Sequence, residues 1–123
     1  MKLIHELIHE HAAAFPDKTA LSDAYGEMTY RELAQKSEAV TCALASLGVH
    51  AGDAVAVYVP YVKEIMLGAL SAWQTGCIFI PLDEAYPEKR LEFILEDAQA
   101  AAVLTVRNFW QEKPLQVAAE KVV

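Results

Sequence analysis

The sequence predicts an α/β fold in which parallel strands alternate with helices, preceded by an N-terminal helix and a small β-hairpin. Two apolar runs without alternation, 54–59 and 101–105, are typical of strands covered on both faces, as in a parallel sheet. Between them, segment 73–87 (WQTGCIFIPLDEAYP) contains glycine and proline signals that end one helix, bound a strand and open the next helix. Helices alternating with buried strands define the fold class.

Composition limits the kinds of protein that this chain can be. Its 123 residues are 54% hydrophobic and 22% charged, which suits one globular domain. The net charge of −7, from 17 acidic and 10 basic residues, argues against a nucleic-acid partner, which would require clustered Lys and Arg. Cys42 and Cys77 lack the spacing of a disulfide framework or a CxxC motif. We therefore expect two buried thiols in a reducing cytoplasm.

No segment predicts export or membrane insertion. His5, Glu6 and His9 interrupt the apolar residues of the N-terminus, whereas a signal peptide needs an unbroken apolar run. The longest apolar stretch, 65–73, falls far short of the roughly 20 residues that span a bilayer. We expect a soluble cytoplasmic protein without a membrane partner.

The first predicted helix, 3–15, contains the letters HELIH, which match a zinc-peptidase signature with two histidines four residues apart. His5 and His9 are expected on the solvent side of this helix, roughly 120° and 160° from the centre of its apolar stripe. Ala12 and Phe15 occupy the positions of the glycine and third histidine of the longer signature. An exposed polar face is therefore favoured over a metal site.

Two short extended runs around Gly26 predict a β-hairpin over 19–30. Thr29 stands three residues before Glu32, which is the spacing of a capping box. A helix should therefore begin near Tyr30, and Gly48 should end it. Its apolar stripe is expected to contain Leu33, Ser37, Val40, Leu44 and Leu47.

The second half of the chain is predicted to continue the alternation. Helix 62–75 is apolar nearly all round, which is typical of a helix inside a larger assembly. Strand 77–80 should follow, then a helix that Pro87 opens. Beyond Thr105 the pattern is weak, and Pro114 interrupts it.

Motifs for chemistry are sparse. The glycines are scattered and form no phosphate-binding loop of the GxGxxG or GxxxxGK[ST] type. Ser46, His50 and Asp53 could form a triad, but no GxSxG elbow is present and turn residues are the favoured interpretation.

Three side chains follow the end of strand 77–80, the place where α/β proteins position functional groups: Asp83, Glu84 and Tyr86. Asp83 is nevertheless expected to tie its own loop together, and Tyr86 to pack over the next helix. Arg90 is expected to pair with Glu92, Glu96 or Asp97, at the surface or partly buried, rather than to form an active site.

Two segments resemble core motifs of the amino-acid adenylation domains of nonribosomal peptide synthetases, which are AMP-forming acyl-adenylate synthetases. MTYREL at 28–33 resembles the first motif. Segment 74–87 resembles the second, usually Lys-Ala-Gly-x-x-Tyr-x-Pro-Leu-Asp followed by Pro-x-Tyr-Pro, with Thr75, Phe79 and Glu84 as departures. The resemblance is clear over 1–105 and leaves 106–123 as an undefined tail.

The resemblance implies that residues 1–123 are the incomplete N-terminal portion of the family's large subdomain. An intact domain of the family makes an aminoacyl-AMP from an amino acid and Mg-ATP, and then loads a phosphopantetheinyl carrier protein. Its phosphate loop, its substrate and ribose aspartates and its C-terminal lysine all follow the two motifs found here. No catalytic, cofactor-binding or metal-binding residue is therefore assigned in this chain, and none of these ligands is expected to bind it alone.

Two functions follow from these observations. The chain is either a catalytically silent N-terminal fragment of an adenylating ligase, or a non-catalytic module that docks on a partner chain supplying the rest of the domain. Its apolar helix and doubly buried strands predict an exposed apolar patch larger than the roughly 300–600 Å² of ordinary monomers.

Overall fold

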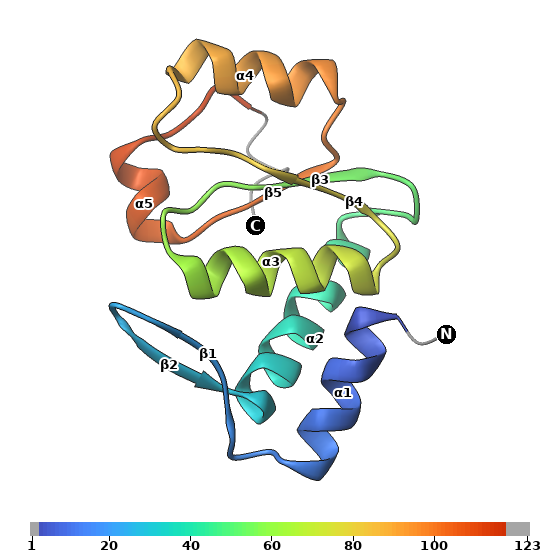
Figure 1. Ribbon diagram of the computed structural model, residues 1–123. Coiled ribbons are helices and arrows are strands. Elements are labelled where there is room, and N and C mark those ends of the chain that lie inside the picture. The colour runs from blue at the N-terminus through green and yellow to red at the C-terminus, as the bar shows by residue number, and fades with distance from the viewer. Residues whose placement is uncertain (1–2, 118–123) are drawn as a thin grey trace.

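The computed structural model describes residues 3–117, and these form the predicted α/β fold (Figure 1). In chain order the elements are α1 (Ile4–Ala14), β1 (Thr19–Asp23), β2 (Gly26–Thr29), α2 (Tyr30–Ser46), β3 (Ala54–Val57), α3 (Val62–Gln74), β4 (Ile78–Pro81), α4 (Glu88–Asp97), β5 (Ala102–Leu104) and α5 (Arg107–Glu112).

A three-stranded parallel sheet forms the centre of the fold. Its order is β4-β3-β5, so β3 has a neighbour on each side, with Val55 opposite both Phe79 and Ala102. Among the described residues, β4 and β5 each pair on one side only. The sheet is the predicted parallel one, and it has two open edges in this part of the chain.

Helices cover both faces of this sheet, as the unalternating strands require (Figure 1). On one face, Ala56, Tyr58 and Val103 pack with Leu91 and Leu95 of α4 and with Phe109 of α5. On the other face, Val55, Val57 and Leu104 pack with Leu44 of α2 and Ala72 of α3. Side chains on both faces of the sheet are therefore buried under helices.

The N-terminal elements form a separate layer against α3. β1 and β2 are antiparallel and make the predicted hairpin. Met28 of β2 and Leu33 of α2 are buried against Leu70 of α3. The capping box is confirmed, because Thr29 Oγ1 accepts a hydrogen bond from Glu32 N at 3.1 Å and Glu32 Oε1 accepts one from Thr29 N at 3.3 Å.

Glycine and proline positions agree with the predicted boundaries to within one residue. Gly48 and Gly76 end α2 and α3 with φ of 81° and 74°, in the left-handed region where a Cβ would be strained. Pro87 is the residue before α4 rather than its first residue, since its ψ is 144° and the helix begins at Glu88. Pro81 is the last residue of β4, and the strand begins at Ile78 rather than at Cys77.

The predicted burial of Cys42 and of Leu47 is wrong. Cys77 is buried, but Cys42 is exposed. At about 100° per residue, Cys42 lies some 180° from Leu33 on α2, which places its thiol opposite the buried stripe. Leu47 is also exposed, because it follows the last helical residue of α2.

Helix α5 was not predicted. It occupies part of the undefined tail, and Phe109 and Leu115 anchor this segment in the core. Six residues are too few for helical periodicity to stand out. Residues 118–123 of that tail lie outside the described residues.

Candidate functional site

The carboxyl ends of β3 and β4 border a cavity of about 320 Å³, which is where α/β proteins bind ligands. Its lining includes the predicted Glu84 and Tyr86, together with Tyr58, Glu88, Leu91, Glu112, Lys113 and Pro114. Lys113 lies 4.0 Å from Glu84 in an ion pair across the cavity. The lining is acidic overall, with three carboxylates and one ammonium group.

Asp83 and Tyr86 make the predicted local contacts. Asp83 Oδ1 accepts a hydrogen bond from Ala85 N at 2.9 Å, and Asp83 O accepts one from Tyr86 N at 3.0 Å. The Tyr86 ring lies under the guanidinium of Arg90, 4.6 Å from its centroid. Arg90 therefore contacts an aromatic ring rather than Glu92 or Glu96. These residues stabilise the loop and the start of α4.

Tyr58 was missed as a residue of this cavity. Its hydroxyl donates a hydrogen bond to Lys113 O at 3.0 Å, and its ring packs 4.7 Å from Phe109. Burial, together with the negative charges of Glu88 and Glu84, raises the pKa of Tyr58, so its hydroxyl stays protonated. This contact joins β3 to the segment after α5, which is a structural function.

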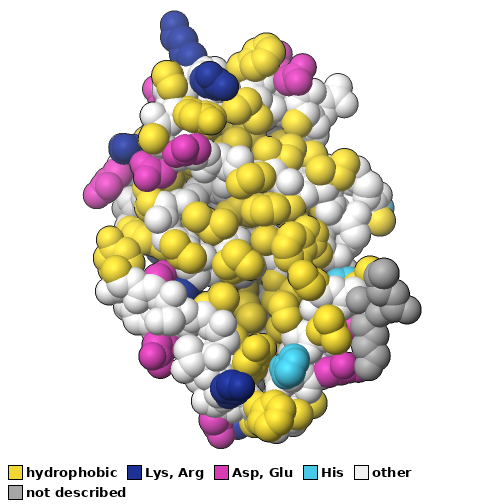
Figure 2. Space-filling model, in the orientation of Figure 1, with side chains coloured by type: hydrophobic (Ala, Val, Ile, Leu, Met, Phe, Trp, Pro, Cys, Tyr) yellow, Lys and Arg dark blue, Asp and Glu magenta, His cyan; other side chains and the backbone are white. Residues whose placement is uncertain are grey.

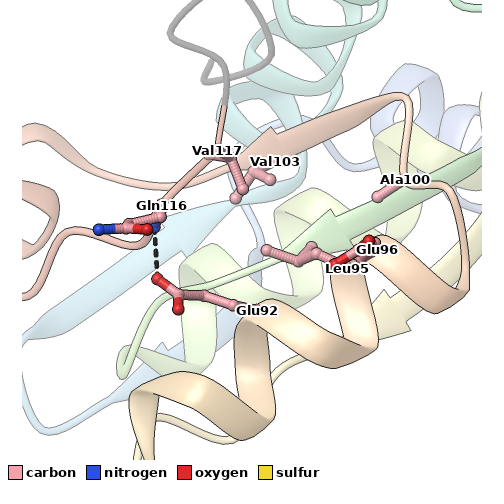
Figure 3. Close-up of a pocket in the computed structure, with 7 residues that line it drawn as sticks. All are labelled: Glu92, Leu95, Glu96, Ala100, Val103, Gln116 and Val117. Atoms are coloured by element: carbon pink, nitrogen blue, oxygen red, sulfur yellow. Dashed lines mark hydrogen bonds between the residues drawn. The ribbon is translucent and has the colours of Figure 1, made fainter.

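A second cavity, of about 350 Å³, lies between α4 and segment 116–117 (Figure 3). Glu92 Oε2 accepts a hydrogen bond from Gln116 N at 2.6 Å. The carboxylate of Glu96 lines the same cavity, and Leu95, Ala100 and Val103 form its apolar side. The arrangement holds the chain after α5 against α4 and brings no nucleophile and base together.

The structure gives His5 and His9 different surroundings. His9 is exposed, as predicted, and its Nε2 lies 2.7 Å from Gln74 Nε2 of α3. His5 is half-buried rather than on the solvent side, beside Trp73 and Cys77 in an apolar pocket. Among residues 3–117, no group of three or more His, Cys, Asp or Glu could hold a metal ion.

His50 and Asp53 lie in the turn before β3, as favoured, whereas Ser46 is the last residue of α2. Ser46 Oγ donates to Cys42 O at 3.0 Å within its own helix, and His50 N donates to Asp53 Oδ2 at 2.8 Å. The three side chains therefore make no nucleophile–base–acid chain.

The structure thus defines the fold class as a parallel α/β domain with an N-terminal helix and a β-hairpin. Residues 8–123 match the family described as AMP-binding enzyme, and the chain belongs to this family. No described helix is long and apolar enough to cross a membrane.

Curated relatives specify the branch of the family. Tyrocidine synthase 1 of Brevibacillus parabrevis is 34% identical over 110 residues, which are 89% of this chain and 10% of that protein. Tyrocidine synthase 3 of the same organism is 31% identical over 104 residues, 85% of this chain and 2% of that protein. The segment is therefore homologous to adenylation domains of nonribosomal peptide synthetases and spans a small part of these relatives.

Solved structures give the same result. The four-domain nonribosomal peptide synthetase AB3403, bound to AMP and glycine, matches all of this chain with a TM-score of 0.85 and 25% identity, and the match covers 9% of that chain. VinN in complex with 3-methylaspartate matches 98% of this chain with a TM-score of 0.83 and 26% identity, over 34% of that chain. The fold described above is the N-terminal portion of such domains.

Proposed function

We propose that this chain is the N-terminal part of an adenylation domain that activates an amino acid as aminoacyl-AMP with ATP and Mg²⁺ and passes it to a phosphopantetheinyl carrier protein. The observation that supports this proposal is the family match over residues 8–123, together with relatives that are peptide synthetases. The fusion of an adenylation domain to a carrier protein among the structural neighbours agrees with such a partner.

We further propose that residues 1–123 alone do not catalyse this reaction. The left-handed glycines, Gly26, Gly48, Gly52 and Gly76, lie in separate turns and form no phosphate cradle. The described residues also contain no carboxylate cluster suited to a cation. ATP and Mg²⁺ therefore do not fit the groups present here, and no chemical step is assigned to this chain.

The decisive experiment is a chimera in which this chain replaces the matching segment of the tyrocidine synthase 1 adenylation domain. We expect the chimera to catalyse amino-acid-dependent ATP–pyrophosphate exchange, and the isolated chain to show none. A folded chimera without exchange for any amino acid would contradict the proposal. ATP–pyrophosphate exchange by the isolated 123-residue chain would contradict the proposal that this chain alone is inactive.

A second candidate function is a docking module that a separate chain completes. The specific observation in its favour is the row of exposed apolar side chains on α3, namely Val62, Met66 and Trp73. Hydrophobic side chains gather across the face of the molecule where α3 lies (Figures 1 and 2). Co-expression with the rest of the tyrocidine synthase 1 domain tests this function. Failure of the two chains to co-purify would contradict it.

A further inference from the structure

A groove of about 160 Å³ lies on the α2/α3 side of the sheet, at the carboxyl ends of β3 and β5. Val57, Val59, Leu104 and Val106 form its floor, and Val40 of α2 and Leu67 of α3 form its sides. Gly68 keeps α3 close to the floor, because a Cβ there would lie 2.7 Å from Val57 Cγ2. The groove is almost entirely apolar.

One charged side chain lines this groove. Glu64 stands in the first turn of α3 and is half-buried. Its carboxylate has no hydrogen-bond or ion-pair partner among residues 3–117. The helix dipole favours a negatively charged side chain in the first turn of a helix. Its place in an apolar groove without a partner still costs desolvation free energy.

We propose that this groove receives an extended segment from the downstream part of the adenylation domain, with apolar side chains on the floor and one Lys or Arg paired with Glu64. This inference rests on the proposed function. The structural neighbours that match all or nearly all of this chain continue well beyond the match, which covers 34% of VinN, so most of such a domain lies outside these residues. A basic side chain on this segment would pair with the carboxylate of Glu64.

The test compares the same substitutions in two proteins, the chimera described above and the isolated chain. Glu64→Lys reverses the charge in the groove, and we expect at least tenfold lower ATP–pyrophosphate exchange and a lower thermal midpoint in the chimera. In the isolated chain the same substitution should lower the thermal midpoint only slightly, because it loses the favourable interaction with the helix dipole but no paired cation. Glu96→Lys makes the same charge change on exposed α4 and should be neutral in both.

Glu64→Gln keeps the shape of the side chain and removes its charge. In the chimera we expect this variant to lose less ATP–pyrophosphate exchange than Glu64→Lys does. Exchange at the wild-type level would contradict the pairing of Glu64 with a cation. If Glu64→Lys changed the thermal midpoint by the same amount in the chimera and in the isolated chain, the groove would not be the docking site. An inactive chimera carrying the wild-type chain would instead contradict the proposed function, so the two failures are distinct.

Discussion

Gly68 sets the distance between α3 and the sheet. Alanine there would gain about 1 kcal/mol in helix propensity, but its Cβ would lie 2.7 Å and 3.0 Å from the two methyl groups of Val57. Overpacking of this kind typically costs about 1–3 kcal/mol. We expect Gly68→Ala to lower the free energy of unfolding by about 1 kcal/mol, measured by urea denaturation.

Val57→Ala supplies the control for this prediction, because it removes the methyl groups that the new Cβ would strike. In the double variant the two substitutions should couple favourably, so that their combined cost is less than the sum of the single costs. Additive costs would show that Val57 is not the obstacle.

Thr29 caps the N-terminus of α2, and the sequence predicts this cap because the partner, Glu32, stands three positions away. Both hydrogen bonds of the box are present in the structure. Thr29→Ala should cost about 1 kcal/mol of unfolding free energy in urea, and Thr29→Ser should cost less because serine keeps the acceptor oxygen. Equal losses for the two variants would contradict the capping explanation.

At the scale of elements, Asp23 joins the hairpin to α3. Its carboxylate accepts hydrogen bonds from Tyr25 N at 2.8 Å and from Lys63 N at 3.2 Å, and it lies 3.7 Å from Lys63 Nζ. Tyr61, the residue before α3, makes no side-chain cap, so Asp23 caps this helix from a distant element.

This contact predicts a dependence of stability on pH. Burial raises the pKa of Asp23, but the hydrogen bonds from Tyr25 and Lys63 and the charge of Lys63 outweigh it, so the net pKa lies below its ordinary value. Because the folded-state pKa is lowered, the stabilisation is present above the unfolded-state pKa and is lost as pH falls through the folded-state pKa. Urea denaturation from about pH 6 down to about pH 2 should show less acid destabilisation in Asp23→Asn than in the wild type.

Lys63→Met is the matched control for the acid dependence. It removes the positive charge and keeps the backbone N–H, so it should lose a smaller part of the dependence than Asp23→Asn does. An Asp23→Asn profile that parallels the wild type would contradict the assignment to this carboxylate.

Elements could be predicted from the sequence where a local rule fixes them. Glycines at helix ends, the capping box and the unalternating strands predicted α2, α3, β3 and β4 to within a residue or two. The predicted strand 54–59 ends at Val57, although Tyr58 and Val59 are also buried. The Asp23 cap, the Tyr58 bond to Lys113 O and the groove at Glu64 could not be predicted, because each joins positions far apart in the chain. Helix α5 is held by Phe109 in the core rather than by its own periodicity.

For the whole molecule, the important feature is the amount of apolar surface that residues 3–117 leave uncovered. Half-covered strands at sheet edges and exposed apolar helix faces promote association between chains. Ile78 illustrates this, since it lies on the edge strand β4 and is 58% exposed, whereas Ile80 on the same face of that strand packs against the core that contains Leu91.

Substitutions of Ile78 and Ile80 test whether the first is a surface residue and the second a core residue. Ile78→Lys should shift the isolated chain towards monomer in sedimentation velocity and change its unfolding free energy by no more than about 0.5 kcal/mol, because no packed contact is lost. Ile80→Lys should instead destabilise the fold strongly, since it places an ammonium group against buried apolar side chains. If Ile78→Lys destabilised the isolated chain as much as Ile80→Lys, the edge of β4 would already be covered within this chain.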